Sequence, residues 1–471
     1  VFRRLLLPVY EAEVGMGVDR VALGKRAAKV LVETLFEGDA GSKRRALHLL
    51  EQLRPEAAAR PLATFAAQEV DGELRARALV ARAAIPKPLQ ASEIEPLLAS
   101  PDRRVRLASA WAVHRLGPES LRAGLLDAED PAVRALAALS FAARPNAHVA
   151  STLASRFAKD MNAEVKMAAS IALGRLGEAR HRSSVARAAV AGTPRERRAA
   201  LFALAGSRSK EALDAIALGF FDESPLVRKT ARLAAHTASP PAIELEVTGL
   251  PRVGDLLEGL VELELPVDGS LAHVVPALEE AARLMIAGPV ERKLAVLHVL
   301  DAGEGLDEDT ARALVAAVEG DVARLLESED ARVRRAATSL LVSRSSRLAP
   351  AALAAALERG DEEVARVALE RHGPFLDEGT RPRVEAAALD AGRWPLRRAA
   401  VALLRRQHPS ASRVTLERVL LTDTHAIVRA EAAKALAEVE GAEAALERAS
   451  RLDASEAVQE AARRALASTF D

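Results

Sequence analysis

The sequence predicts an all-α protein, built as a right-handed α-solenoid of stacked helix pairs with one small β-hairpin inserted. The first observation is a segment that recurs along the chain and reads Asp-x-x-Val-Arg in its clearest copies. Its valine positions lie about thirty residues apart, or twice that where a weaker copy intervenes, a spacing typical of stacked repeats. These positions are Val105, Val133, Val165, Val227, Val333, Val364, Val428 and Val458. The second observation is a stretch between two series of repeats in which apolar and polar residues alternate.

Each repeat is expected to hold two helices. From Val428, Ala432 and Ala435 follow at the positions that share one helix face. A cluster such as residues 100–102, Ser-Pro-Asp, precedes this second helix and supplies an N-cap and a proline. A shorter apolar segment ahead of it, for example residues 94–98, predicts the first helix. Such a pair cannot cover its own apolar face, so the pairs must stack.

The aspartate and the basic residue of the recurring segment return in step. The pairs are Asp130 and Arg134, Asp222 and Arg228, Asp330 and Arg334, and Asp423 and Arg429. They are either a row of catalytic or ligand-binding pairs or a structural ladder. In a ladder each Asp caps a turn and each Arg bridges to it or to the next repeat. The ladder is favoured, because stacking requires a feature in almost every repeat, whereas a site needs to be unique.

The Asp-x-x-Val-Arg-x-x-Ala-Ala-x-Ala-Leu pattern resembles HEAT repeats, and most closely the short HEAT-like repeats of the phycobilisome-lyase type. The resemblance covers roughly residues 41–240 and 289–471. It implies a HEAT-like solenoid. It does not specify a function, because such arrays serve as scaffolds, adaptors, lyases and a few nucleic-acid enzymes.

Four parts are expected along the chain. Residues 1–40 are out of phase with the repeats and predict an N-terminal cap or the remnant of a longer chain. Residues 41–240 form a first array of about seven repeats, and residues 289–471 a second of about six. Residues 241–288 form an irregular insertion that contains the β-hairpin.

The hairpin rests on two alternating stretches, Ile243 to Val247 and Val261 to Val267, whose period of two favours strands. A helical turn is expected between them at Asp255 to Leu260. The insertion is either a docking element or hinge between the two arrays, or a loop that packs back on the solenoid.

Composition excludes several function classes. The 66 basic and 66 acidic residues balance, so no global field attracts nucleic acid or an acidic membrane surface. Cysteine is absent, which excludes disulfides, thiolate metal sites and Cys nucleophiles. No apolar run reaches the length of about 18 residues that a membrane span needs. Abundant Arg and Ala suggest a bacterial coding sequence, and of the two compartments that fit, the cytoplasm is favoured over the periplasm.

No catalytic, metal or cofactor motif emerges. The ten histidines occur singly, without metal-ligand spacing, and are expected at surface or cap positions. Residues 15–17, Gly-Met-Gly, do not make a phosphate loop. The basic cluster of Arg195, Arg197 and Arg198 is short, which argues against nucleic-acid binding. We therefore expect a non-catalytic protein–protein interaction scaffold or adaptor without cofactors. The alternative is a HEAT-like enzyme, of lyase or DNA glycosylase type, or a nucleic-acid-binding solenoid.

One asymmetry separates the two arrays. The side of the second helices opposite their core stripe is apolar in the first array and charged in the second. We interpret the apolar side as a groove for a protein partner, with these candidate binding residues: Leu107, Trp111, Leu139, Met167 and Ile171. The alternative is internal packing, in which the N-terminal segment or the insertion fills the groove or the helices lie deeper between their neighbours.

Overall fold

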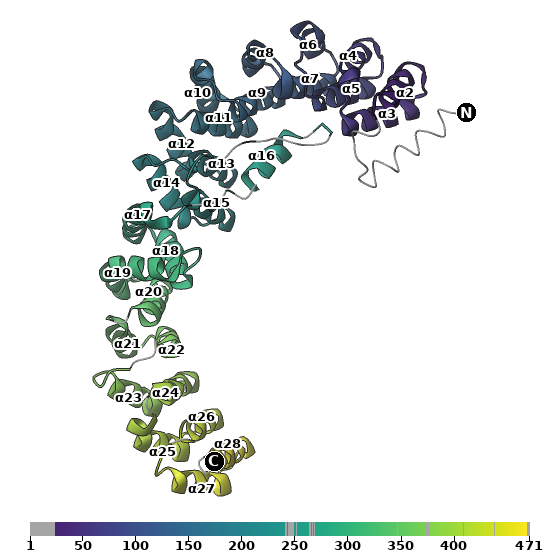
Figure 1. Cartoon of the computed structure of the whole chain (residues 1–471). Helices are drawn as coiled ribbons and strands as arrows, with labels where there is room; N and C mark the ends of the chain where they lie inside the picture. The colour runs from purple at the N-terminus through teal and green to yellow at the C-terminus, as the bar shows by residue number, and fades with distance from the viewer. Residues whose placement is uncertain are drawn as a thin grey trace. The chain divides into compact units, whose positions relative to one another are not determined.

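The computed structural model describes residues 24–240, 243, 249–250, 252–262, 265, 267, 269–345, 347–372, 376–407, 409–437 and 439–468. Within these ranges every regular element is a helix, and the α-helices occur in successive pairs (Figure 1). We call the first member of each pair its A helix and the second its B helix. The predicted all-α architecture of stacked helix pairs is therefore confirmed.

The chain forms two compact units. Unit 1 comprises Val1–Gly219 with Ser224–Ser270, and unit 2 comprises Phe220–Glu223 with Leu271–Asp471. The A helices α2 to α14 are α2 (Gly24–Glu37), α4 (Ala59–Gln68), α6 (Ala91–Leu98), α8 (Glu119–Gly124), α10 (Ala150–Lys159), α12 (Ala179–Ala191) and α14 (Lys210–Phe220). The B helices of unit 1 are α3 (Ala40–Leu53), α5 (Gly72–Ala84), α7 (Arg103–Leu116), α9 (Pro131–Ala143), α11 (Ala163–Leu176), α13 (Pro194–Leu204) and α15 (Pro225–His236). Helix α16 (Val253–Glu262) follows outside this alternation.

Unit 2 repeats the same arrangement. Its A helices are α17 (Val275–Ala287), α19 (Glu308–Arg324), α21 (Ala349–Glu358), α23 (Arg381–Asp390), α25 (Arg413–Thr422) and α27 (Glu443–Leu452). Its B helices are α18 (Val290–Ala302), α20 (Ala331–Arg344), α22 (Glu362–Arg371), α24 (Trp394–Gln407), α26 (Ala426–Ala435) and α28 (Glu456–Ser468). In both units each B helix packs against the next B helix along the chain.

Most B helices begin at a side chain that caps them. The Asp102 carboxylate accepts a hydrogen bond from the backbone N–H of Arg104 at 2.8 Å. The same kind of cap is made by Asp39, Asp71, Asp130, Asn162, Thr193, Asp330 and Asp361. Such caps satisfy N–H groups that have no partner within the helix. The capping side chain, most often an aspartate, therefore determines where these B helices start, although Asn162 caps α11 and His425 caps α26.

Small residues allow the B helices to approach one another closely. Val105, Ala108 and Ala112 of α7 are fully buried, as the helical spacing predicts. The closest approach is between α11 and α13, where a Cβ added at Gly174 would lie 2.3 Å from the carbonyl oxygen of Ala203. Larger side chains at these positions would push the helices apart, so the alanine-rich pattern is a requirement of the stacking.

The β-hairpin predicted over residues 243–267 is wrong. Its described residues contain no strand, and residues 253–262 form α16. The expected turn at Asp255 to Leu260 is part of this longer helix, which also includes Val261 from the predicted second strand. The apolar residues of this segment recur with helical spacing, and all five are buried: Val253, Leu256, Leu257, Leu260 and Val261. This pattern explains why the segment forms a helix. The other alternating residues, 244–248, 263–264 and 266, lie outside the described residues.

The expected N-terminal cap is described only in part. Residues 24–37 form α2, which packs against the first B helix, α3. Residues 1–23 lie outside the described residues.

A ladder of ion pairs connects successive B helices near their N-terminal ends. Arg134 of α9 donates from Nε to Oδ2 of Asp160 at 2.8 Å, and Asp160 lies one repeat further along the chain. Arg134 Nη1 also donates to the carbonyl oxygen of Ala128 at 2.7 Å. We call each such pair a rung. Four further rungs span 24 to 27 residues: Lys43 with Glu69, Arg334 with Asp361, Arg397 with Asp423 and Arg429 with Asp453.

The rungs confirm the structural interpretation of the recurring pairs and specify the partner. Asp130 caps α9 through the N–H of Ala132 at 3.0 Å and pairs with Arg103 of the preceding repeat at 2.7 Å. Arg134, in the same repeat as Asp130, pairs with the Asp of the following repeat instead. One carboxylate thus starts a helix and joins two repeats.

A second set of arginines lies at the C-terminal ends of B helices. Each donates a hydrogen bond to a backbone carbonyl oxygen of the preceding B helix. Arg344 Nη2 donates to the carbonyl oxygen of Asp301 at 3.0 Å, and Arg406 Nη2 to that of Leu369 at 2.9 Å. Arg144 donates to the carbonyl oxygen of His114 in the same way. The last carbonyls of a helix lack partners within it and attract cations. Both ends of α9, α20 and α24 are therefore joined to a neighbouring repeat.

Removing a buried rung should destabilise unit 1 more than removing an exposed one. The side chains of Arg134 and Asp160 are only 16% and 2% exposed. We expect Arg134→Ala to lower the free energy of unfolding in urea by about 1.5–3 kcal/mol, because a charged hydrogen bond and its buried acceptor lose their partner. The control Arg103→Ala, whose side chain is 62% exposed, should cost roughly 0–1 kcal/mol. Equal losses would contradict the ladder.

The rungs should also make unit 2 sensitive to acid. Hydrogen bonding to the Arg429 guanidinium lowers the pKa of Asp453, and hydrogen bonding to Arg334 lowers the pKa of Asp361. Such a carboxyl contributes its full stability above the unfolded pKa of about 3.9 and loses it as pH falls through the lower folded pKa. We expect Arg429→Ala to unfold at less urea than wild type at neutral pH and to lose less stability below about pH 4. An unchanged acid slope would show that Arg429 does not stabilise the Asp453 carboxylate.

Candidate functional site

One segment of unit 1 leaves the helix pairs, crosses the B helices and returns to its starting point. We call the described residues between His236 and Gly269 the strap, and the side of the B helices on which it lies the strap face (Figure 1). At its two ends the N–H of Gly269 donates to the carbonyl oxygen of His236 at 2.7 Å. His236 Nδ1 lies 3.1 Å from the carbonyl oxygen of Gly269. The two ends of the strap therefore lie next to each other, at the C-terminal end of α15.

Helix α16 is the part of the strap that is held most firmly. It packs against three B helices, α9, α11 and α13. Its apolar residues are at most 6% exposed: Val253, Leu256, Leu257, Leu260 and Val261. Asp255 and Gly259, on the other side of the helix, are exposed. Burial of one such apolar side chain stabilises by about 1.5–3 kcal/mol, so this stripe is the main attachment of the strap.

A pair of ion pairs fixes the orientation of α16. Glu258 Oε1 accepts from Arg195 Nε at 2.5 Å, and Glu258 Oε2 accepts from Arg198 Nη1 at 2.9 Å. Both arginines belong to α13, and the Arg198 side chain is only 9% exposed. Arg197, between them in sequence, donates from Nη1 to the carbonyl oxygen of Gly192. The basic cluster that sequence reasoning weighed as a nucleic-acid contact therefore serves internal contacts.

The strap reaches the opposite end of the strap face at Gly249. Its backbone N–H donates to Glu51 Oε1 of α3 at 2.6 Å, although the two residues are 198 positions apart in the sequence. Gly249 has a φ of 82°, a left-handed conformation that glycine adopts without a steric penalty. Of the two interpretations of the insertion, the described residues show the one in which it packs back on the solenoid.

Four of the five predicted partner-binding residues lie in the interior. Trp111, Leu139, Met167 and Ile171 are 1%, 0%, 3% and 0% exposed, and Leu107 is half-buried. Leu139, Met167 and Ile171 belong to α9 and α11, against which α16 packs. The expectation that these positions form an open groove does not hold, because neighbouring helices and the strap bury them. Partner binding by Leu139, Met167 or Ile171 would require α16 to leave α9 and α11.

Trp111 is part of a buried ring stack. Its indole lies 5.0 Å from the imidazole of His114, with an angle of 10° between the ring planes. His114 is 4% exposed, which corrects the expectation that every histidine lies at a surface or cap position. Burial, followed by the charges of Arg144 and Arg115, lowers the pKa of His114 to about 3. The imidazole is therefore neutral at physiological pH and is not poised to exchange protons there.

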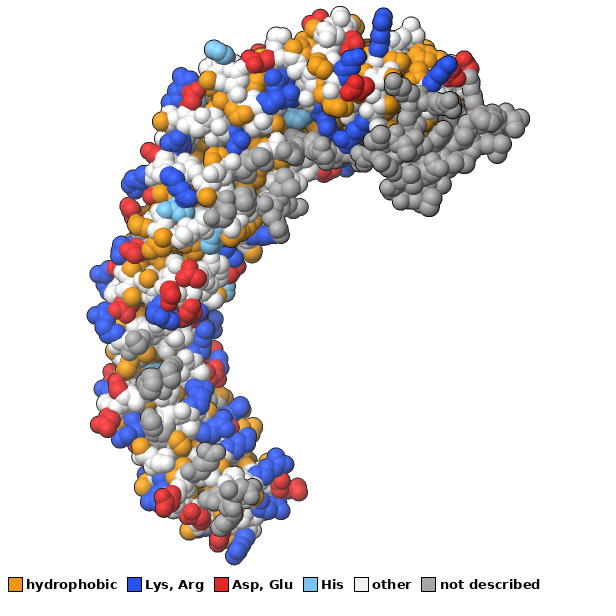
Figure 2. All heavy atoms as spheres, viewed as in Figure 1, with side chains coloured by type: hydrophobic (Ala, Val, Ile, Leu, Met, Phe, Trp, Pro, Cys, Tyr) orange, Lys and Arg blue, Asp and Glu red, His pale blue; other side chains and the backbone are white. Residues whose placement is uncertain are grey.

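The corresponding side of unit 2 is charged, and its basic and acidic side chains form ion pairs with one another. Arg335 lies 3.6 Å from Glu363, and Arg366 lies 2.6 Å from Glu370, so the charges neutralise one another along neighbouring B helices. On the surface of unit 2 that Figure 2 shows, basic and acidic side chains are likewise interspersed. The apolar side of unit 1 is thus covered in part by α16, whereas the corresponding side of unit 2 carries paired charges.

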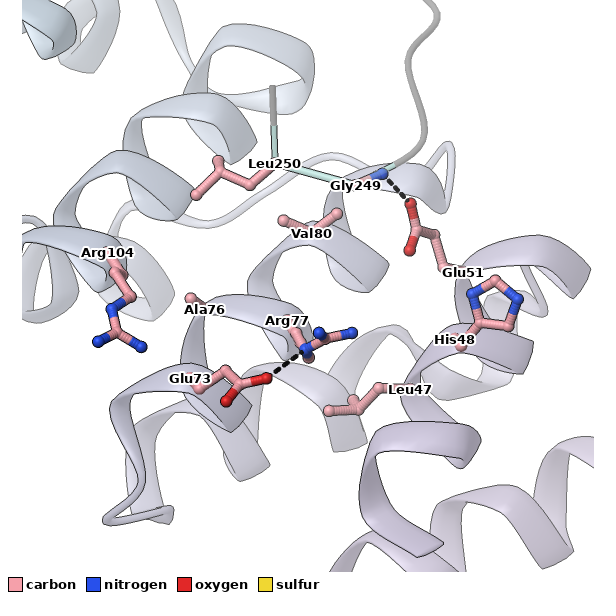
Figure 3. Close-up of a pocket in the computed structure, with 10 residues that line it drawn as sticks. All are labelled: Leu47, His48, Glu51, Glu73, Ala76, Arg77, Val80, Arg104, Gly249 and Leu250. Carbon is pink, nitrogen blue, oxygen red and sulfur yellow. Dashed lines mark hydrogen bonds and ion pairs between the residues drawn. The ribbon is translucent and has the colours of Figure 1, made fainter. Parts of the chain in front are cut away.

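A pocket of about 270 Å³ remains open on the strap face beside Gly249 (Figure 3). Leu47, Ala76, Val80 and Leu250 supply its apolar lining. Its polar lining consists of His48 and Glu51 from α3, Glu73 and Arg77 from α5, and Arg104 from α7. Figure 3 shows His48 and Arg104 on opposite sides of the Glu73–Arg77 ion pair, whose atoms lie 3.0 Å apart. Sequence reasoning missed this pocket, because the strap residues that border it are remote in the chain.

Other kinds of site find no support in the part of the chain that the structure describes. These residues contain no group of three or more His, Asp or Glu side chains placed to hold a metal ion. None of their helices is both long enough and apolar enough to cross a bilayer.

Deleting the Glu258 carboxylate should loosen α16 while the repeats stay folded. Glu258→Ala removes both ion pairs to α13, so we expect amide exchange in residues 253–262 to accelerate by roughly tenfold, or about 1.4 kcal/mol. Exchange in α11 should not change. Asp255→Ala, on the exposed side of the same helix, is the matched control. Identical exchange in wild type and Glu258→Ala would mean that the apolar contacts alone hold the strap.

Comparisons with known proteins show the fold. No protein-family model matches the chain, and a comparison with curated proteins finds no match. Among solved structures, the karyopherin Kap121p bound to RanGTP aligns with a TM-score of 0.51 and 13% identity, over 94% of this chain and 52% of that chain. Kap121p bound to Nup53p aligns with a TM-score of 0.50 and 13% identity, over 99% and 56%. The chain spans about half the length of these HEAT-repeat solenoids, and its fold is HEAT-like.

Proposed function

We propose that this protein is a non-catalytic scaffold that binds a protein partner on the strap face of unit 1. The observation that carries the proposal is the strap itself. It is a stretch of polypeptide that lies across B helices, with an apolar helix face, two ion pairs at Glu258 and a backbone hydrogen bond to Glu51. These are the contacts by which a groove of a helical protein holds a peptide. The pocket beside Gly249 leaves part of the same face available.

The pocket favours an apolar side chain flanked by an acidic one. Its apolar lining suits the first, and Glu73 is already neutralised by Arg77 at 3.0 Å and faced by Arg44 at 3.5 Å. Arg104 is exposed and forms no ion pair with another described residue, so it is available to a carboxylate. A partner segment of this composition would continue the line of the strap along α5 and α7.

The comparisons support a protein partner by analogy. The two aligned Kap121p structures contain the proteins RanGTP and Nup53p. Fold similarity of this kind does not transfer a particular partner. Adaptor activity, and the closer resemblance to the short repeats of phycobilisome lyases, form part of the proposal.

An enzyme or a nucleic-acid-binding solenoid is the competing assignment. Several observations favour the scaffold. The recurring Asp and Arg side chains are engaged in rungs, Arg195 and Arg198 are engaged by Glu258, and His114 is buried and neutral. A catalytic site requires titratable groups that converge in a cavity, whereas both carboxylates of the pocket beside Gly249 are already engaged, Glu73 by Arg77 and Glu51 by the N–H of Gly249.

Photo-crosslinking should locate the partner. A photoreactive amino acid at position 48, which borders the pocket, should yield a discrete adduct in an extract of the source organism. The same group at Arg60, exposed on the A helix α4, should not. Arg104→Glu should reduce the adduct formed from position 48 roughly tenfold through like-charge repulsion, whereas Arg60→Glu should leave it unchanged. Equal adducts from positions 60 and 48 would exclude the strap face as the docking surface.

A further inference from the structure

In unit 1, Lys166 lies at the position of a rung cation but has no carboxylate in the next repeat. A pocket lies beside it. Lys166 follows Val165 in α11, as Arg134 follows Val133 in α9. In the rungs the partner carboxylate comes 24 to 27 residues later, and for Arg134 it comes 26 residues later. The residue 26 positions after Lys166 is Gly192. Lys166 therefore has the position of a rung cation without the carboxylate of the next repeat.

The chain does not supply a substitute at this point. Thr193 is the N-cap of α13, and its hydroxyl and N–H both donate to Glu196 Oε2 at 2.8 Å, so a capping box replaces the usual aspartate cap. A Cβ at Gly192 would lie 2.8 Å from the carbonyl oxygen of Ala188 and 2.9 Å from Glu196 Cβ. Among the described residues, no carboxylate oxygen lies within the 4 Å ion-pair distance of Lys166 Nζ.

A pocket of about 370 Å³ occupies this place between the A helices α10 and α12. Its walls include the apolar side chains of Phe157 and Leu173. Three of its lining residues are basic: Lys166, His181 and Arg187. Glu196 is its single carboxylate, and one oxygen of that carboxylate is engaged by Thr193. The pocket is therefore an apolar hollow with an excess of positive charge.

Arg187 adds donors that the fold does not use, and His181 adds a ring nitrogen that makes no hydrogen bond. His181 Nε2 is buried and makes no hydrogen bond, and it lies 3.7 Å from the nearest carboxylate oxygen, that of Glu178. Arg187 is exposed and forms no ion pair with another described residue. A binding site typically combines apolar walls with a few convergent polar groups, and this pocket has both.

We propose that this pocket binds a carboxylate with a short apolar body, which takes the place of the missing rung. In five repeats a cation at this position pairs with a carboxylate. Arg75 and Arg106, at the same position of their repeats, donate to backbone carbonyl oxygens instead. The carboxylate accepts hydrogen bonds from Lys166 and its neighbours, and the apolar body packs against Phe157 and Leu173. Either a free organic acid or the acidic side chain of another polypeptide has this chemistry. The site lies between A helices, so it is independent of docking on the strap face.

Saturation-transfer NMR on the full chain tests the proposal with defined probes. Hexanoate represents the free acid, with hexanamide as its neutral control. A capped alanine-rich peptide with one central glutamate represents the side chain, with the glutamine peptide as its control. We expect binding of at least one carboxylate probe and binding of its neutral control that is weaker by roughly tenfold. Hexanoate alone would identify a free acid as the ligand, and the glutamate peptide would identify a polypeptide side chain. Absence of binding by both would overturn the proposal.

Variants link the binding to the missing rung. Lys166→Gln should weaken the carboxylate probe roughly tenfold, whereas Lys159→Gln, an exposed lysine of α10 outside the pocket, should not. Without a probe, Lys166→Gln should unfold at the same urea concentration as wild type, because no ion pair is lost. Destabilisation like that expected of Arg134→Ala would show that Lys166 already has a partner. That result, or unchanged probe binding by Lys166→Gln, would refute the assignment.

Discussion

The ion pair between a basic side chain of one repeat and a carboxylate of the next is the constraint on which this structure depends. Packed alanines alone would let neighbouring B helices slide, because small apolar surfaces fit in several registers. The rung removes that freedom, since the Asp160 carboxylate that receives Arg134 also accepts the N–H of Asn162. One acidic residue thus sets both a turn and a stacking distance. The arginines at the opposite helix ends, such as Arg344, add a second constraint in the reverse direction.

In each unit, regular stacking places the same side of successive B helices next to one another. The side chains on this side differ between the two units. In unit 2 it carries arginine and glutamate side chains that pair between neighbouring helices, such as Arg335 with Glu363. In unit 1 the strap covers it, and α16 supplies the apolar surface that water would otherwise contact. A face that already binds a segment of its own chain is suited to binding a segment of another protein. This reasoning leads to a scaffold rather than an enzyme, and to the uncovered pocket beside Gly249 as its docking point.

Interruptions of the repeat are where function is most readily sought. A feature that recurs in every repeat serves the stacking, whereas a departure from it is free to serve something else. Two departures occur in unit 1: the strap after α15, and Gly192, where a rung carboxylate is expected. The first was visible in the sequence as a loss of period. The second emerges only when Lys166 is compared with the rungs and the pocket between α10 and α12 is seen to lie beside it.

The sequence by itself determined the helix pairs, their period, their aspartate caps and the structural role of the Asp and Arg residues, because these depend on contacts within one repeat or between adjacent ones. It also located the insertion, but assigned a strand from Val261, which belongs to α16, since a short apolar run fits both periods. Only the tertiary structure decided that Trp111, Leu139, Met167 and Ile171 are interior, and that Glu258 and Gly249 reach α13 and α3. The physical reason is the sequence separation between the residues in contact. Gly249 and Glu51 are 198 residues apart, and no local pattern encodes which distant face an amphipathic segment will cover.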